Sequence, residues 1–93
     1  MHARISTWNV RPEDYEPVSR EVAPHTAELK RQPGYVSGYE VRPTPDRFLT
    51  ITIWESEAQM EAAFARVMPA LSGIMEGRVE LVDRVVGPAQ DFE

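Results

Sequence analysis

The sequence predicts an α+β domain in which four strands form one antiparallel sheet and two helices cover one face of that sheet. Three observations support this prediction. Two segments carry apolar side chains at spacings of three and four residues, four segments are rich in β-branched and aromatic residues, and turn residues separate these segments in the order β-α-β-β-α-β. A length of 93 residues suits one domain, so we expect residues 1–93 to form a single domain.

The first predicted strand spans residues 4–10, and a helix follows it. Pro12, Glu13 and Asp14 come next, and a proline with two acids is typical of the first turn of a helix. This helix carries one stripe of inward-facing residues: Tyr15, Val18, Val22, His25 and Leu29. Pro24 lies inside the stripe, so we expect it to kink or divide the helix.

The second and third predicted strands form a hairpin. Residues 35–42 make the second strand, with a bulge or a close backbone approach expected at Gly38, and residues 43–46 make the connection. Residues 48–54 give the clearest strand in the chain. Their alternation places two sets of side chains on opposite faces of the sheet: Leu49, Ile51 and Ile53 on one, and Thr50, Thr52 and Trp54 on the other.

The second helix has a defined start. Ser56 and Gln59 form a capping box before a second apolar stripe at helical spacing, which consists of Met60, Phe64, Val67 and Leu71. We expect Pro69 and Gly73 to end or bend this helix. Residues 79–86 form the fourth predicted strand, which Gly87-Pro88 stops.

This order of elements, with both helices on one face of the sheet, corresponds to the ferredoxin-like fold. Neither face of the predicted sheet is polar, because Ile5 and the isoleucines of the third strand line one face and the two tryptophans line the other. A second copy of the chain would bury the uncovered apolar face at about 25 cal/mol per Å². We therefore expect a homodimer that forms a dimeric α+β barrel.

The composition excludes several classes of function. The net charge is −5, from ten Lys and Arg against fifteen Asp and Glu, which argues against a nucleic-acid partner. Without cysteine there is no disulfide, thiolate metal site or thiol nucleophile, and two histidines give little basis for a metal site. The N-terminus lacks the apolar core of a signal peptide, and no stretch approaches the roughly 20 apolar residues of a membrane span. We expect a cytoplasmic protein with no metal and no membrane segment.

Three sequence elements together resemble a known family. They are Ser6-Thr7-Trp8-Asn9-Val10 before the proline-acid helix start, Gln32-Pro33-Gly34-Tyr35 with Gly38-Tyr39, and Thr52-Ile53-Trp54-Glu55-Ser56-Glu57. This pattern covers nearly the whole chain and resembles the antibiotic biosynthesis monooxygenase (ABM) domain superfamily of small dimeric α+β barrels. The resemblance implies the same fold and the same dimer.

The resemblance also bears on activity. Members that resemble quinone-forming monooxygenases act on polycyclic phenols without metal or flavin, and a tryptophan at the position of Trp54 lines their pocket. Those enzymes carry an asparagine and a tyrosine where this chain has Thr50 and Met60. A haem-degrading branch uses an asparagine, a tryptophan and a histidine, where the nearest matches here are Ser6, Phe64 and no histidine. Haem degradation is therefore disfavoured.

The candidate proton acceptor is His25. It lies on the inward stripe of the first helix, and histidine changes charge near neutral pH. The alternative is a core histidine that is hydrogen-bonded to a backbone carbonyl. We expect the other charged side chains on the strands, Arg4, Glu40, Glu80 and Arg84, to pair across strands or to face water.

Seven further residues are candidates for a ligand pocket: Ser6, Trp8, Thr50, Thr52, Trp54, Phe64 and Met68. The hydroxyls could hold a ligand oxygen, and the aromatic and thioether side chains suit a flat apolar ligand. The same residues equally suit a strand surface and a packed core.

Two functions remain open at this point. The first is a monooxygenase that needs no cofactor other than oxygen and oxidises a small apolar aromatic or polyketide-like compound. The second is a non-catalytic dimer that binds a small apolar molecule or has a structural role. An open apolar cavity with converging polar groups would favour the enzyme, whereas a space filled by Trp8, Trp54 and Phe64 would favour the structural role.

Overall fold

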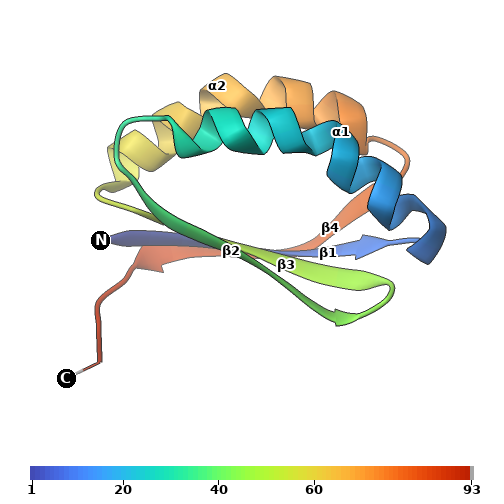
Figure 1. The fold of residues 1–93 in the computed structure, drawn as a ribbon. Coiled ribbons are helices and arrows are strands. Elements are labelled where there is room, and N and C mark those ends of the chain that lie inside the picture. Colours follow the sequence, from blue (N-terminus) through green and yellow to red (C-terminus); the bar gives the residue numbers. More distant parts are fainter. Residues whose placement is uncertain (93) are drawn as a thin grey trace.

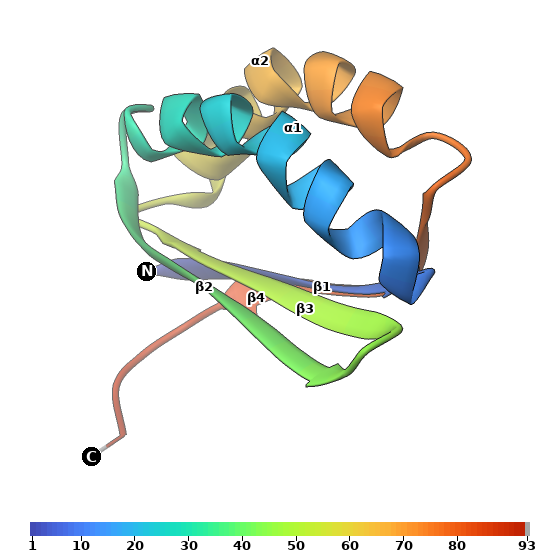
Figure 2. The same cartoon turned by 45° about the vertical axis from the view of Figure 1, so that its right-hand side comes forward.

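The structure of the chain is a computed structural model that describes residues 1–92, and it has the predicted α+β architecture (Figure 1). Two helices lie on one face of a four-stranded antiparallel sheet (Figure 2). The elements follow the predicted order: β1 (His2–Val10), α1 (Pro12–Lys30), β2 (Tyr35–Thr44), β3 (Arg47–Trp54), α2 (Glu57–Met75) and β4 (Val79–Pro88). The ferredoxin-like prediction is confirmed.

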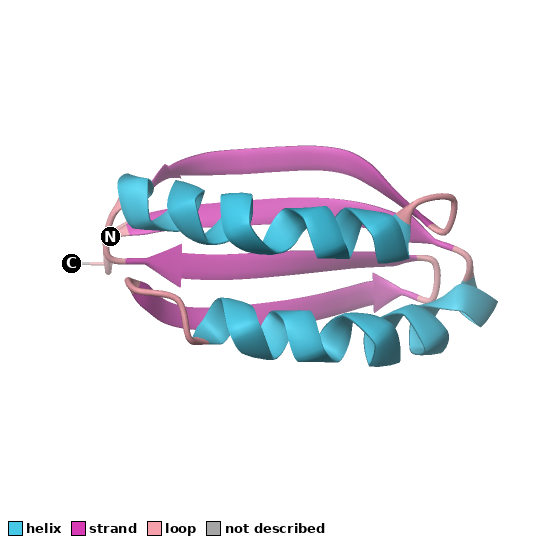
Figure 3. Ribbon diagram, turned by 90° about the horizontal axis from the view of Figure 1, so that it is seen from above, coloured by secondary structure: helices cyan, strands magenta, loops and turns pink. Residues whose placement is uncertain are grey.

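The strands lie in the order β2-β3-β1-β4, so the first strand is central in the sheet. Viewed from above, α1 and α2 run side by side over the strands (Figure 3). In the register, Ser6 pairs with Thr50 on β3 and with Arg84 on β4. A β-bulge between Thr7 and Trp8 shifts the pairing of β1 with β4. These three strands therefore bring the two hydroxyls and Arg84 to the same level of the sheet.

The two faces of the sheet differ in what covers them. Ser6, Trp54 and Phe48 are buried beneath the helices. On β1 and β3, every second residue points to the opposite face, which therefore carries Ile5, Leu49, Ile51 and Ile53. No element among residues 1–92 covers this face. Tyr39 and Val85 are 62% and 56% exposed. An apolar sheet face is thus open in the single chain.

The hydrophobic core lies at one end of the space between helices and sheet. Trp54, at the end of β3, is fully buried and packs with Leu29 of α1 and with Met60, Ala63 and Val67 of α2. Its ring makes edge contacts with the rings of Tyr35 and Phe64, at centroid distances of 5.5 and 5.8 Å. This cluster fixes both helices to the end of the sheet.

Both helices start where the sequence predicts. Neither helix is interrupted at the proline and glycine positions where the sequence suggested a break. The Ser56 Oγ accepts a hydrogen bond from the Gln59 backbone N–H at 3.2 Å, as a helix cap does. Pro24 does not divide α1, and Pro69 and Gly73 do not end α2. Pro24 and Pro69 are exposed, and so are the residues four positions earlier, so the carbonyls that lose their helical partners lie on the solvent side. β4 ends at Pro88, two residues beyond the predicted end at residue 86, because Gly87 and Pro88 still pair with Ala3 and His2.

Candidate functional site

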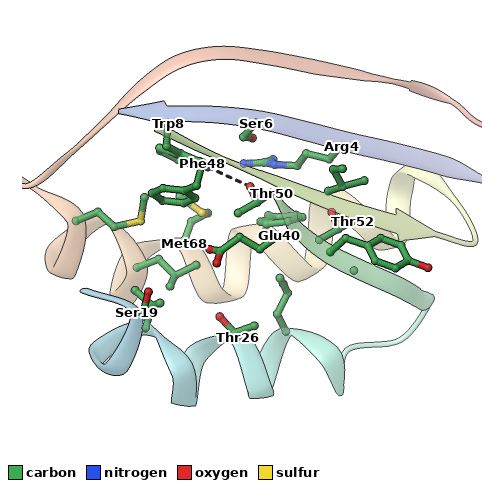
Figure 4. Close-up of a pocket in the computed structure, with 18 of the residues that line it drawn as sticks. Arg4, Ser6, Trp8, Ser19, Thr26, Glu40, Phe48, Thr50, Thr52 and Met68 are labelled. Carbon is green, nitrogen blue, oxygen red and sulfur yellow. Dashed lines mark hydrogen bonds between the residues drawn. The ribbon is translucent and has the colours of Figure 1, made fainter. Parts of the chain in front are cut away.

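A pocket of about 300 Å³ lies between the helices and the sheet (Figure 4). The sheet contributes Arg4, Ser6 and Trp8 from β1, Gly38 and Glu40 from β2, Phe48, Thr50 and Thr52 from β3, and Arg84 from β4. The helices contribute mainly apolar side chains, among them Val18, Val22, Leu29, Phe64, Met68 and Leu71. Alternation on each strand explains the sheet wall, because every second residue faces the helices. The pocket is thus a mainly apolar chamber with polar groups on its sheet side and with Ser19, Thr26 and Lys30 on its α1 side.

Two hydrogen bonds link the polar side chains of the sheet wall. The Trp8 Nε1–H donates to Thr50 Oγ1 at 3.0 Å, which is the dashed line in Figure 4. The Arg84 Nε–H donates to the buried Ser6 Oγ at 3.0 Å. The Thr52 Oγ1 is also buried, and no residue in the described range forms a hydrogen bond with it. These hydroxyls lie on neighbouring strands and face the same chamber.

Tyr15 and Glu40 connect α1 to β2 at the pocket wall. The Tyr15 hydroxyl donates a hydrogen bond to the Glu40 carboxylate, and the Arg42 guanidinium lies 3.6 Å from the centre of the Tyr15 ring. The hydrogen bond to Glu40 raises the pKa of Tyr15, with burial adding to the effect, so the phenol stays protonated. Glu40 is the one carboxylate among the described residues that line the pocket.

Two arginines enter the pocket from the sheet. The Arg4 guanidinium lies over the Phe64 ring, 3.9 Å from its centre. Burial, and secondarily the charge of Arg84, lower the pKa of Arg4 to about 10. Burial also lowers the pKa of Arg84. The expectation that the strand charges pair across strands or face water holds for Glu40 and Glu80, which are exposed. It was wrong for Arg4 and Arg84, which are partly buried because the register turns them toward the chamber.

The structure brings together six of the eight candidate site residues. Ser6, Trp8, Thr50, Thr52, Phe64 and Met68 line the pocket. Trp54 belongs to the core beside it, where its Nε1 has no hydrogen-bond partner among residues 1–92. His25 is half-buried on α1 and is not among the lining residues, because the pocket side of α1 runs through Tyr15, Val18, Val22, Thr26 and Leu29.

The described residues give no sign of a metal site. No group of three or more His, Asp or Glu side chains in residues 1–92 is placed to hold a metal ion. No helix in the described part of the chain is long and apolar enough to cross a membrane.

Comparison with known proteins identifies similar sequences and folds. The family model described as "Antibiotic biosynthesis monooxygenase" matches residues 1–67. No curated protein matches the chain. Among solved structures, SnoaB, a cofactor-independent oxygenase from Streptomyces nogalater, is 18% identical with a TM-score of 0.78 over 98% of this chain and 94% of that chain. HapK from Hahella chejuensis is 14% identical with a TM-score of 0.79 over 100% and 96% of the two chains. A structure described as an antibiotic biosynthesis monooxygenase is 16% identical with a TM-score of 0.70 over 98% and 100%.

Proposed function

Because the chain belongs to the antibiotic biosynthesis monooxygenase family, we propose that it is a cofactor-independent monooxygenase for a small apolar aromatic or polyketide-like compound. The observation that carries this proposal is the chamber between helices and sheet, which combines apolar walls with hydroxyl and guanidinium groups on one side. Ligand pockets typically have this composition, and a volume of about 300 Å³ suits a small flat molecule. SnoaB, described as a cofactor-independent oxygenase, has the same fold.

The proposed reaction begins with loss of a proton from a phenolic substrate. We assign the role of proton acceptor to Glu40 rather than to His25, since Glu40 lines the pocket and His25 does not. The Tyr15 hydroxyl holds the Glu40 carboxylate in place. Loss of the proton makes the ring electron-rich. In this proposal the hydroxyls of Ser6 and Thr52, whose residues line the pocket, donate to the phenolate oxygen and stabilise its charge.

Dioxygen then oxidises the phenolate. A ring carbon loses its hydrogen and gains one oxygen atom as a quinone carbonyl, the phenolic oxygen becomes the second carbonyl, and the other oxygen atom leaves as water. The substrate supplies all four electrons, so this balance needs no flavin, metal or external reductant.

A homodimer is part of the proposal. The open sheet face presents Tyr39, Val41 and Val85 at 48–62% exposure, next to the isoleucines of β1 and β3. Burial of this face against a second copy would remove apolar surface from water and leave the pocket on the opposite, helix-covered side of each sheet.

The test measures oxygen consumption and quinone absorbance with anthrone, a tricyclic ketone that tautomerises to the phenol anthranol, as substrate. We expect turnover that depends on dioxygen, a loss of at least tenfold in Glu40→Gln, and little change in His25→Gln. Loss of turnover in His25→Gln instead would return the proton-acceptor role to that residue. Tight binding of polycyclic phenols without oxygen consumption would support the alternative function, a non-catalytic ligand-binding dimer.

A further inference from the structure

Two arginines face the same end of the pocket from the two strands that pair there. Arg84 on β4 is the register partner of Ser6 on β1, and Arg4 precedes Ser6 by two residues on the same face of β1. The two guanidinium groups are close enough for the charge of one to lower the pKa of the other. Like charges thus converge on one side of a mainly apolar chamber.

Neither arginine has an acidic partner within residues 1–92. The four ion pairs in this part of the chain involve His2, Arg11, Arg66 and Arg78. The pocket carboxylate, Glu40, is bound by Tyr15 on the β2 side. Partly buried charges are normally paired, because removing a charge from water is unfavourable. The fold therefore maintains an uncompensated positive charge at this position.

Both guanidinium groups are held in orientations that suit an incoming anion. Arg84 uses Nε for Ser6, which fixes its plane and leaves its terminal nitrogens without any partner in the described residues. The Arg4 guanidinium carbon lies 3.9 Å from the centre of the Phe64 ring, and no Arg4 side-chain nitrogen donates a hydrogen bond to another residue in the described range. Arginine binds carboxylates through two parallel N–H donors, which needs such a fixed plane.

A third polar group faces the same region. Thr52 is the register partner of Arg4, it lines the pocket, and its buried Oγ1 has no hydrogen-bond partner within residues 1–92. A buried hydroxyl without a partner is uncommon. Because a water-sized probe does not reach this oxygen, the Thr52 side chain would have to rotate toward the chamber to meet a ligand.

From these contacts we infer that Arg4 and Arg84 form a subsite for a carboxylate substituent of the aromatic ligand, with the Thr52 hydroxyl as an additional donor. The inference rests on the proposed function for the aromatic part of the ligand and specifies its class: an aromatic acid rather than a neutral phenol. The ring would lie among the apolar side chains of the helices, and the carboxylate would lie against β1 and β4.

Calorimetric titration with 2-naphthoate and 2-naphthamide tests the subsite, because the two probes share a ring and differ in charge. We expect the wild-type protein to bind the carboxylate about tenfold more tightly than the amide, because a charge-assisted hydrogen bond contributes a binding free energy of that order. Arg4→Met and Arg84→Met should each abolish this preference, which is measured as the ratio of the two dissociation constants within the same variant. Arg66→Met, which removes an exposed arginine outside the pocket, is the control and should keep the preference.

The outcomes separate the subsite from the proposed reaction. Equal affinity for the two probes, or a preference that survives in both pocket variants, would overturn the subsite even if the protein oxidises anthrone. A carboxylate preference that disappears in the variants would support the subsite even if no oxygen is consumed. Circular dichroism spectra establish that each variant is folded. Arg4→Lys is a further variant, which keeps the positive charge but lacks the planar pair of donors. It should retain less than half of the difference in binding free energy between the two probes.

Discussion

The ring of Trp54 meets the ring of Phe64 edge to face, with 5.8 Å between the ring centres. Trp54 is fully buried in the core, while Phe64 also lines the pocket and carries the Arg4 guanidinium on its face. Phe64 is thus a wall shared by the core and the pocket. The position of Arg4 depends through this ring on a tryptophan that does not line the pocket.

Substitution of Trp54 should separate packing from hydrogen bonding. Trp54→Ala leaves a large cavity, and we expect a loss of about 3–5 kcal/mol in the free energy of unfolding. Trp54→Phe keeps an aromatic ring and removes an Nε1–H that has no partner among residues 1–92, so we expect a loss of only about 1 kcal/mol. Denaturant unfolding measures both values. An equal loss in the two variants would contradict this account.

Gly34 and Gly77 form a matched pair for substitution, since both have positive φ angles, of 89° and 77°. A Cβ at Gly34 would lie 2.7 Å from the Gln59 Cβ, whereas a Cβ at Gly77 would have nothing within 4 Å. Gly77→Ala should cost about 1 kcal/mol for the backbone conformation alone, and Gly34→Ala about 2–3 kcal/mol because the start of α2 must also move. Thermal unfolding gives the comparison, and a smaller loss at Gly34 than at Gly77 would rule out the steric explanation.

The Glu21–Arg78 pair predicts a pH dependence of stability. Arg78 donates to both Glu21 oxygens, at 2.8 and 3.0 Å, and these hydrogen bonds lower the pKa of Glu21 below its ordinary value of 4.5. A lowered carboxyl pKa stabilises the folded chain above about pH 4.5 and loses that effect as the pH falls through the folded value. We therefore expect Glu21→Gln to be less stable than wild type near neutral pH, with a difference that vanishes in acid. Glu16→Gln, at an exposed site of the same helix, is the control and should show no such trend.

Arg4 predicts the opposite trend at alkaline pH. Folding lowers its pKa from the ordinary arginine value to about 10, so the charged form opposes folding at neutral pH, and this opposition declines as the pH rises through 10. We expect Arg4→Met to unfold at a higher temperature than wild type near neutral pH, with the gap narrowing above pH 10. Lower stability of Arg4→Met at neutral pH would mean that the arginine contributes packing or pairing that outweighs its desolvation.

The open sheet face predicts the oligomeric state. Val41 is 48% exposed and Val85 is 56% exposed in the single chain, so a charge at either position should be tolerated by the monomer but not by a dimer. Light scattering should give a dimeric mass for wild type and a monomeric mass for Val41→Glu and Val85→Glu. Ala65→Glu adds the same charge to the exposed side of α2 and should remain dimeric.

Residue alternation was sufficient to predict the elements and the two faces of β3, because strand and helix periods leave a direct trace in the sequence. It could not supply the register. Whether Arg84 faces the pocket or solvent depends on the bulge between Thr7 and Trp8, since a shift of one residue reverses every side chain on a strand. The sequence alone therefore could not predict that Arg84 faces the pocket. His25 shows a related limit: its spacing fits the stripe from Val22 to Leu29, but between those two residues it is Thr26, one position further along α1, that lines the pocket.

The strand order also bears on how the chain acquires its structure. The first strand to be synthesised, β1, is central in the sheet and pairs with β4, which joins residues 2–10 to residues 79–88. Contacts between such distant residues slow folding, because a long loop must close before they form. A nascent chain can pair β1 with β3 once residue 54 has left the ribosome, but one edge of β1 stays unpaired until β4 follows. During that interval the exposed edge of β1 is open to pairing with other chains.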